Sequence, residues 1–275
     1  MKFTKMHGAG NDYVYINGFE EIVADPSALA ARISDRHFGI GSDGLIMVLP
    51  SETADLRMRI FNADGSEAEV CGNGIRCLAK YAFEHGIMTN NPMRVETAAG
   101  MREVELFLEG DKVTRAKVKM GVPRLAPDDI PVRLKHHPVV EYVVDISQWH
   151  LSMTCVNMGN PHAVFFIDDI AEFPLKEIGP LLEHDPLFPE RVNVHIVQVL
   201  SRNEVRMRTW ERGSGMTLAC GTGAAAVCVA GVLTDRTERK VEIHVPGGEL
   251  DLEWAGNEES VYMTGPCEEV FTGNW

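Results

Sequence analysis

The tetrapeptide Cys71-Gly72-Asn73-Gly74 recurs as Cys220-Gly221-Thr222-Gly223, 149 residues further along the chain. A repeat of four residues can arise by chance, but other polar residues keep the same offset. They form two pairs, Asn11 with Asn160 and Asn62 with Glu211. A single offset shared by several positions indicates a duplicated architecture. We therefore predict two similar halves that face each other.

The residues around each tetrapeptide predict a mixed pattern of strands and helices. Apolar stretches after the tetrapeptides predict helices over 74–85, ending at Gly86, and over 221–233. Asp25-Pro26 predicts the start of a shorter helix that runs to Arg36. Alternating or continuous apolar residues predict strands over 13–16, 45–49, 56–61, 139–146, 153–156, 163–167, 192–199 and 204–210, with hairpins over 93–120 and 240–254.

Length and composition exclude several classes of protein. With 275 residues, 45% hydrophobic and 24% charged, the chain can bury a core without disulfides. A net charge of −14 disfavours nucleic acid as a partner, and no apolar run reaches the length of a membrane span. Because the N-terminus lacks the apolar run of a signal peptide and the six cysteines are scattered, we expect a cytoplasmic protein with reduced thiols.

The two repeated cysteines stand where a thiol can take part in proton transfer. A cysteine just before a helix lies near outward-pointing N–H groups and the positive end of the helix dipole, which lowers its pKa. The adjoining glycines leave room for a substrate carboxylate at those N–H groups. If two such helix ends meet in one cleft, one thiolate can remove an α-proton while a thiol delivers a proton to the opposite face. The amides would then stabilise the carbanion in place of an imine cofactor.

The remaining four cysteines have different surroundings. Cys77 and Cys228 lie in apolar helical stretches, where a free cysteine acts as a small hydrophobic residue. Cys155 lies in a predicted strand and Cys267 near the C-terminus, neither with glycines beside it. We predict structural roles for all four.

The stretch from Asn62 to Arg76, NADGSEAEVCGNGIR, resembles the signature of the diaminopimelate epimerase family at every fixed position. Further blocks resemble the family's other motifs in the same order: Met6 to Asp12, Gly159 to Val164, Arg191 to Asn193, Trp210 to Gly213 and Ala219 to Gly223. The resemblance extends from Lys2 to about Gly273.

The resemblance implies a cofactor-independent epimerase that interconverts LL- and meso-2,6-diaminopimelate, on the bacterial route to lysine and peptidoglycan. It implies that Cys71 and Cys220 are the acid/base pair, and that His162 and Glu211 tune the thiols. It also implies a homodimer with Phe271 at the contact, and no metal. The implied substrate-binding residues are Asn11, Asn62, Gly72, Asn73, Asn160, Asn193, Glu211, Arg212, Gly221 and Thr222. Some members carry glutamine where this chain has Gly44, so a ligand contact there is missing or made by backbone.

The chemistry of these side chains fits the implied roles. Arg212 has a planar fork suited to the distal carboxylate of a diacid, and Glu211 can accept hydrogen bonds from an ammonium group. Each residue also has a purely structural interpretation. The asparagines can cap turns or strand ends, Arg212 can form a surface ion pair with Glu211, and His162 can be a buried structural histidine.

Three other functions compete with this interpretation. Residues 39–44 match the dinucleotide-binding Gly-Xaa-Gly-Xaa-Xaa-Gly, but they follow a helix and lead into a strand, the reverse of the required context. A two-thiol racemase of proline or hydroxyproline shares the architecture, but a substrate with one carboxylate needs no distal clamp. A redox or metal protein using Cys71, Cys220, His7 and His162 is disfavoured because no Cys-Xaa-Xaa-Cys pair is present.

We therefore predict an α+β protein of two pseudo-repeated domains. Each is a curved, roll-like mixed β-sheet around a central helix, with the active site in the cleft between them. The N-terminal half spans residues 1–117 and the C-terminal half 118–262. The family's architecture implies that the tail, residues 263–275, returns to the first half.

Overall fold

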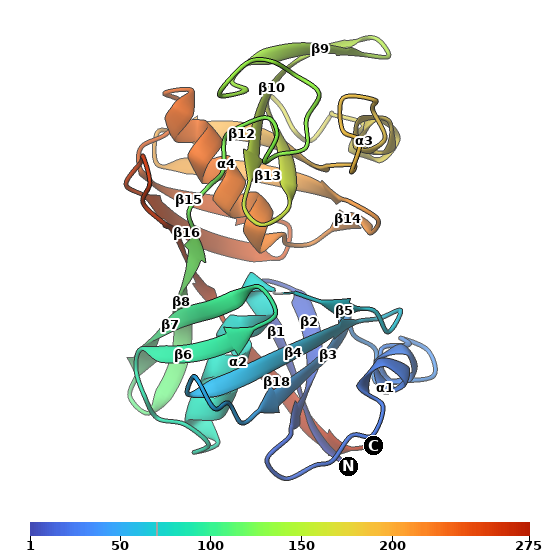
Figure 1. Ribbon diagram of the computed structural model, residues 1–275, viewed down its shortest axis with the longest axis vertical. Helices are drawn as coiled ribbons and strands as arrows, with labels where there is room; N and C mark the ends of the chain where they lie inside the picture. Colours follow the sequence, from blue (N-terminus) through green and yellow to red (C-terminus); the bar gives the residue numbers. More distant parts are fainter. Residues whose placement is uncertain (70) are drawn as a thin grey trace. The chain divides into compact units, whose positions relative to one another are not determined.

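The 149-residue repeat is visible in the order of elements of the computed structural model, which describes residues 1–69 and 71–275. The chain divides into two units, Met1–Lys119 with Thr264–Trp275, and Met120–Met263. Each unit has one 13-residue helix that starts directly after a repeated cysteine: α2 (Gly72–Glu84) and α4 (Gly221–Leu233) (Figure 1). No helix of the described residues is long and apolar enough to cross a membrane.

The first unit arranges its strands around α2. Strands β1 and β2 pair antiparallel, β2 and β3 parallel, β3 and β4 antiparallel, and β4 and β6 parallel. Helix α2 contacts β1, β2, β3 and β7. The elements are β1 (Lys2–Gly8), β2 (Asn11–Asn17), α1 (Pro26–Ile33), β3 (Gly44–Leu49), β4 (Leu56–Asn62), β5 (Glu67–Ala68), β6 (Met93–Thr97), β7 (Gly100–Glu109), β8 (Lys112–Gly121) and, from the tail, β18 (Glu268–Asn274).

The second unit repeats this pairing pattern around α4. Strands β10 and β11 pair antiparallel, β11 and β12 parallel, β12 and β13 antiparallel, and β13 and β15 parallel. The elements are β9 (Tyr142–Ile146), β10 (Trp149–Asn157), β11 (Pro161–Phe166), α3 (Leu175–Glu183), β12 (Asn193–Ser201), β13 (Glu204–Glu211), β14 (Gly215–Thr217), β15 (Lys240–Val245), β16 (Gly248–Trp254) and β17 (Val261–Pro266). The predicted α+β fold of two pseudo-repeated units is confirmed.

Local sequence explains the helix ends. The Asp25 carboxylate accepts a hydrogen bond from the Ala28 N–H, and Pro26 fills the first helical position of α1, as predicted. Gly86 adopts φ 69° after the end of α2, a conformation that glycine takes without steric cost. The predicted start of α1 and the predicted glycine after α2 therefore follow ordinary capping chemistry, whereas α1 ends at Ile33 and not at the predicted Arg36.

Each unit has its own apolar core. In the first unit, Val14, Ile16, Leu45 and neighbouring side chains pack against α1 residues such as Ile33. Helix α4 is buried along almost its whole length, from Gly223 to Gly231, as expected for a helix that is apolar on all sides. Helix α2 is likewise buried from Gly72 to Ala82, so both central helices lie in the interior of their units.

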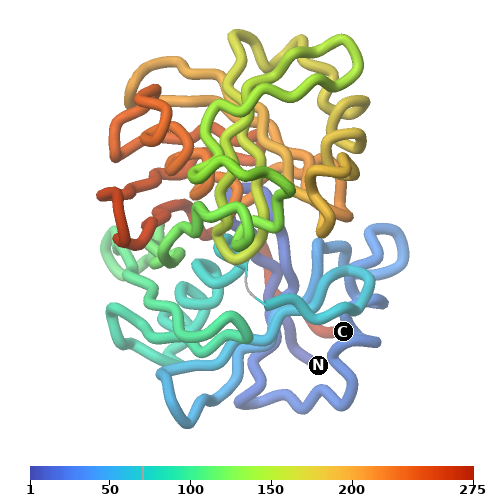
Figure 2. The backbone as a smooth tube through the Cα atoms, turned by 45° about the horizontal axis from the view of Figure 1, so that its top comes forward, coloured from blue at the N-terminus to red at the C-terminus, as the bar shows by residue number. Residues whose placement is uncertain are grey.

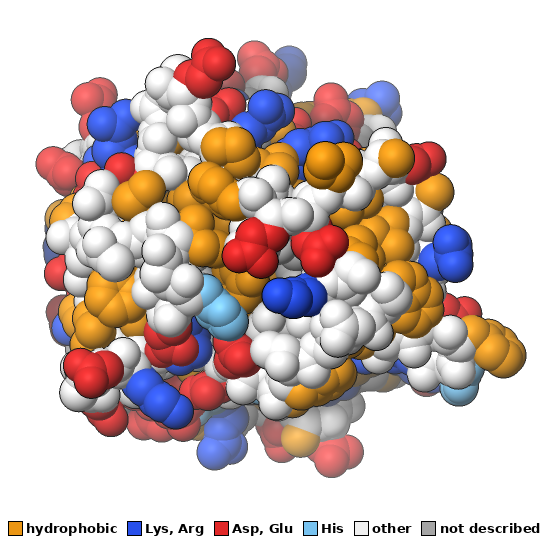
Figure 3. All heavy atoms as spheres, turned by 90° about the horizontal axis from the view of Figure 1, so that it is seen from below, with side chains coloured by type: hydrophobic (Ala, Val, Ile, Leu, Met, Phe, Trp, Pro, Cys, Tyr) orange, Lys and Arg blue, Asp and Glu red, His pale blue; other side chains and the backbone are white. Residues whose placement is uncertain are grey.

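The two chain ends lie side by side in the first unit (Figure 2). The Met1 ammonium donates to the Trp275 carbonyl at 3.1 Å, and the Trp275 N–H donates to the Met1 carbonyl at 2.8 Å. Strand β18 pairs antiparallel with β1. On the face drawn in Figure 3, Lys and Arg side chains lie scattered among Asp and Glu.

Sequence patterns did not predict every element. Helix α3 was missed because Gly179 and Pro180 lie within it, and both residues disfavour a helix interior. Its signal was the apolar spacing of Leu175, Ile178 and Leu182, all buried. Strands β1, β5, β14, β17 and β18 were also not predicted, and β9 begins three residues later than the start of the predicted strand.

Candidate active site

Cys71 is the N-cap residue of α2, with extended backbone angles of φ −132° and ψ 119°. Its Sγ accepts a hydrogen bond from the Gly74 N–H at 3.3 Å, and the thiol donates to the Asn11 Oδ1 at 3.2 Å. The side chain is partly exposed. The thiol therefore lies at the positive end of the helix, beside one of the predicted substrate-binding residues.

A buried arginine holds the first turn of α2 in place. Arg76 is fully buried and donates to the Asn73 Oδ1 at 2.9 Å and to the carbonyl oxygens of Gly72 and Pro266, both at 3.3 Å. Asn73 in turn donates to the Asn11 Oδ1 at 3.4 Å. Arg76 belongs to the motif but was not predicted to have a role at the site. Its guanidinium contacts Gly72 and Asn73, two of the predicted substrate-binding residues.

Asn11 and Asn62 lie at strand ends in the first unit. The Asn11 Nδ2 donates to the Asp43 Oδ2 at 2.7 Å, so Asp43 fixes which face of the amide meets Cys71. The Asn62 Nδ2 donates to the Ser66 Oγ at 3.0 Å within a turn. Both amides therefore have structural contacts of the kind expected for turn and strand-end residues.

Close contacts around Gly44 exclude a glutamine side chain at this position. A Cβ atom at Gly44 would lie 2.1 Å from the Phe61 carbonyl oxygen and 3.0 Å from the Tyr13 ring. The first of these atoms belongs to the backbone of the paired strand β4 and cannot move aside. This backbone arrangement therefore admits no side chain at residue 44.

Cys220 is the N-cap residue of α4 and is only 4% exposed. Burial raises its pKa well above the ordinary value, and the neighbouring Glu211 carboxylate raises it further. The Thr222 hydroxyl, 3.7 Å from Sγ, and the Gly223 N–H act in the opposite direction with smaller effect. The prediction that the helix dipole lowers the pKa of this thiol is therefore wrong. Burial disfavours the charged thiolate of Cys220 more than the Thr222 hydroxyl and the Gly223 N–H favour it.

This difference in surroundings predicts different reactivities for the two thiols. With iodoacetamide at pH 7.5, we expect Cys71 to be alkylated at least about tenfold faster than Cys220, because Cys71 is partly exposed whereas Cys220 is buried and its pKa is raised. Peptide mapping by mass spectrometry at timed intervals measures both rates. Glu211→Gln should accelerate alkylation of Cys220 and leave Cys71 unchanged. Equal rates at the two cysteines would contradict the assignment.

The loop that carries Glu211 and Arg212 is held by a buried carboxylate. Glu183, only 3% exposed, accepts hydrogen bonds from the Gly213 N–H at 2.9 Å and the Trp210 Nε1 at 2.7 Å. Glu183 was not predicted because it lies on α3, the helix that was missed. Within the loop, the Glu211 Oε1 accepts from the Thr217 hydroxyl at 2.6 Å.

The Asn193 side chain is hydrogen-bonded to the backbone of Arg212 and of Pro161. The Asn193 Oδ1 accepts from the Arg212 N–H at 3.0 Å, and its Nδ2 donates to the Pro161 carbonyl at 2.8 Å. Asn193 is 2% exposed. The Arg212 guanidinium donates to the Glu190 carbonyl at 2.9 Å. Asn193 thus links two strand ends that carry predicted substrate-binding residues.

Asn160 and His162 belong to a chain of polar side chains that leads from partly exposed Asn160 to buried His162 and His195. The His162 Nε2 lies 2.8 Å from the Asn160 Oδ1, and the His162 Nδ1 lies 2.9 Å from the His195 Nε2. Burial lowers the pKa of His162 well below its ordinary value, and the charges of His195 and Arg212 add to this effect. His195, whose pKa burial lowers to about 3, was not predicted as a site residue.

The other four cysteines are buried. Burial raises the pKa of Cys77 and Cys228 to about 12 and that of Cys267 to about 11, and it raises the pKa of Cys155 still further. Thiols in such surroundings stay protonated and act as apolar packing groups.

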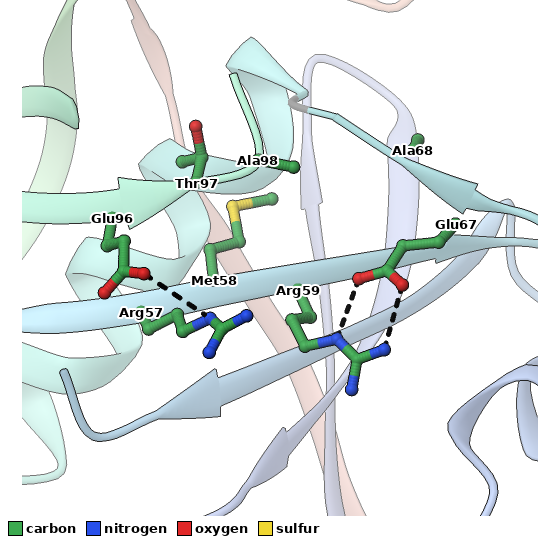
Figure 4. Close-up of a pocket in the computed structure, with 8 residues that line it drawn as sticks. All are labelled: Arg57, Met58, Arg59, Glu67, Ala68, Glu96, Thr97 and Ala98. Atoms are coloured by element: carbon green, nitrogen blue, oxygen red, sulfur yellow. Dashed lines mark hydrogen bonds and ion pairs between the residues drawn. The ribbon is translucent and has the colours of Figure 1, made fainter. Parts of the chain in front are cut away.

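Other features of the described residues do not coincide with the predicted site. A hollow of about 110 Å³ on β4 is lined by two arginines that are already paired, Arg59 with Glu67 at 2.7 Å and Arg57 with Glu96 at 3.8 Å (Figure 4). The one group of possible metal ligands found in residues 1–69 and 71–275 consists of Glu204, Glu242 and His244, within 4.8 Å of one another. It contains neither repeated cysteine.

Comparisons with known proteins agree with the motif assignment. The sequence profile described as diaminopimelate epimerase matches residues 3–126 and 154–270. A protein of Acetivibrio thermocellus named diaminopimelate epimerase is 53% identical over 273 residues, 99% of this chain and 98% of its own length. One of Methanococcus maripaludis with the same name is 47% identical, covering 99% of both chains.

Solved structures that resemble this chain at low identity support the fold. A probable proline racemase from Agrobacterium radiobacter K84 is 15% identical with a TM-score of 0.69, covering 100% of this chain and 92% of its own. A PhzF-family phenazine biosynthesis protein from Bacillus anthracis is 15% identical with a TM-score of 0.70, covering 99% and 98%. From the family profile and the full-length relatives together, this chain belongs to the diaminopimelate epimerase family.

Proposed function

We propose that this protein interconverts LL- and meso-2,6-diaminopimelate by moving a proton on and off one α-carbon, with Cys71 and Cys220 as the acid/base pair. One observation carries the proposal: each half of the repeat places its cysteine at the N-cap of its central helix. A reversible two-base inversion requires one acid/base group on each face of the carbon, since the base of one direction is the acid of the other.

The proposed step balances protons and charge. One thiolate takes the α-proton and becomes a thiol, while the other thiol protonates the opposite face and becomes a thiolate. The negative charge that develops on the substrate is spread into its α-carboxylate. The first-turn N–H groups of both helices, at Gly72, Asn73, Gly221 and Thr222, are proposed to bind that carboxylate. The raised pKa of Cys220 supports its role as the acid at the start of a cycle.

The polar residues beside the thiols are proposed to bind the substrate. Arg212 would bind the distal carboxylate and Glu211 an ammonium group. An amino acid without a second carboxylate and ammonium group would therefore bind poorly. Asn11, Asn62, Asn160 and Asn193 would supply amide contacts. Support comes from the hydrogen bond between Asn11 and the Cys71 thiol, and from the proximity of Glu211 to Cys220.

Assembly and surroundings also belong to the proposal. The two units correspond to the two epimerase halves, with Thr264–Trp275 returning to the first. Phe271 lies on β18, is 47% exposed and packs edge-on against Phe3 at a centroid distance of 5.9 Å, which supports its use in a homodimer contact. Because reactive thiols persist in a reducing compartment, we propose the cytoplasm as the site of action.

Incubation of the reduced protein with LL-diaminopimelate in deuterated water tests the function. We expect meso product with deuterium at the inverted α-carbon, without any added cofactor, measured by chiral chromatography and mass spectrometry. L-Proline and trans-4-hydroxy-L-proline serve as comparison substrates, because structures named for those reactions share this fold. Turnover of proline in place of diaminopimelate would contradict the proposed substrate and retain the mechanism.

A further inference from the structure

We propose that His195 is a positioning residue for this reaction: through His162 it holds the Asn160 amide with its Nδ2–H₂ group turned toward the substrate. The inference rests on the proposed function, which gives Asn160 a substrate contact. It concerns a residue that no motif of the sequence singled out.

The contacts form a single chain of four side chains. The Thr209 Oγ1 lies 3.0 Å from the His195 Nδ1, the His195 Nε2 lies 2.9 Å from the His162 Nδ1, and the His162 Nε2 lies 2.8 Å from the Asn160 Oδ1. Both imidazoles are fully buried, Thr209 is 4% exposed, and Asn160 is partly exposed. The chain therefore leads from the core of the second unit to the proposed binding residue.

The Asn160 end of the chain fixes the direction of every hydrogen bond, because the Asn160 Oδ1 can only accept. A neutral imidazole has one N–H donor and one acceptor nitrogen. The His162 Nε2–H therefore donates to the Asn160 Oδ1, and the His162 Nδ1 accepts from the His195 Nε2–H. The His195 Nδ1 is then an acceptor, to which the Thr209 hydroxyl donates. An amide whose oxygen is held in this way presents its two N–H donors on the other side, as a carboxylate ligand requires.

The internal repeat provides a comparison within the same molecule. In the first unit the residues equivalent to His195 and Thr209 are Ile46 and Ile60, and both pairs face each other across antiparallel strands. The equivalent of His162 is Tyr13. Packing at this position of the fold is thus satisfied by two isoleucines. The polar pair His195 and Thr209 occurs in the second unit, where β11 carries His162. An N–H donor beside His162 is needed there to fix the tautomer of its ring.

His195 also supports the helix that carries the second thiol. A Cβ atom at Gly223 would lie 2.2 Å from the His195 Cε1, so the ring packs directly on the first turn of α4. In the first unit the Ile46 side chain has the same relation to Gly74, at 2.6 Å. Both units therefore have a side chain packed on the first turn of the central helix at this position. In the second unit that side chain, His195, also makes directed hydrogen bonds.

Nuclear magnetic resonance of the imidazole nitrogens tests the direction itself. In ¹⁵N-histidine-labelled protein at pH 7.5, we expect two of the ten histidines to be neutral Nε2–H tautomers that keep this form down to pH 5. Their assignment follows from loss of one signal in His195→Gln and of one in His162→Gln. A protonated His162, or one with its proton on Nδ1, would overturn the proposal.

Kinetics of matched variants test the consequence for substrate binding. The double variant His195→Ile with Thr209→Ile installs the packing of the first unit. It also removes the relay, by which we mean the hydrogen-bond chain from Thr209 through His195 to His162 and Asn160. Because the Asn160 amide can then rotate, we expect KM for diaminopimelate to rise about tenfold, the loss of one hydrogen bond to a charged group, with a smaller change in kcat. Thr209→Val removes only the terminal donor and is expected to give a smaller rise in KM, which tests the relay if the double variant does not fold.

Two conservative variants serve as controls. Thr209→Ser keeps the hydroxyl donor, and His195→Gln keeps an acceptor toward Thr209 and a donor toward His162, so each should recover most of the loss in KM. An unchanged KM in both the double variant and Thr209→Val would refute the relay. Failure of the wild type to turn over diaminopimelate would refute the function instead, while the tautomers would still report the direction of the relay.

Discussion

Replacing either Cys71 or Cys220 by alanine is expected to lower the rate of inversion by about 10²–10⁴-fold, the usual contribution of a general acid or base. Each variant retains one thiol, which can still remove or return a proton on its own side of the α-carbon. We therefore expect slow exchange of deuterium into one stereoisomer without inversion. Under the proposed mechanism the exchanging isomer should differ between the two variants, because the surviving thiol would act on the opposite face of the α-carbon in each.

Serine variants separate proton transfer from helix capping. Serine is a good N-cap residue, so Cys71→Ser and Cys220→Ser should fold normally, but a hydroxyl is far too weak an acid to replace a thiol. Inversion should therefore remain lost in both. Retention of more than a tenth of the wild-type rate in any of the four variants, with folding checked by circular dichroism, would contradict the two-thiol assignment.

Acidification is expected to destabilise the protein strongly below pH 6.5 because His162 and His195 are buried as neutral groups. Above pH 6.5 these imidazoles are neutral in both the folded and the unfolded state, and the contribution to stability is fully present. Below it, the unfolded chain binds protons that the folded state excludes, since burial depresses both folded-state pKa values, that of His195 to about 3. The free energy of unfolding should fall by about 1.4 kcal/mol per pH unit for each histidine.

Urea denaturation at pH values from 7.5 to 4.5 measures this slope, and His195→Gln is the matched control. Removal of one titrating group should make the slope shallower by about 1.4 kcal/mol per pH unit below pH 6. Titration of the carboxylates contributes equally to the pH dependence of both proteins, so it cancels in the difference between their slopes. Identical slopes for wild type and variant would show that His195 becomes protonated in the folded state.

Much of the fold could be predicted from local sequence. Asp25 with Pro26 starts α1, Gly86 follows the end of α2, and the predicted helix over 221–233 has the bounds of α4. Helix α3 could have been predicted as well, by applying the 149-residue offset to α1, since Pro26 corresponds to Leu175. Local propensity failed there because Pro180 opposes a helix that packing against β12 and β13 stabilises.

The sequence by itself determined the duplication, the family and the two cysteines at helix starts, because capping residues, glycines and repeat offsets act over a few neighbouring positions. Tertiary structure alone decided the state of those groups. The pKa of Cys220 is raised because folding buries it beside Glu211, and neither effect is visible in the motif. His195 likewise becomes a partner of His162 only when β11 and β12 pair, which brings side chains 33 residues apart into hydrogen-bonding distance. Desolvation and long-range pairing depend on the folded environment, so they cannot be read from any short stretch of the chain.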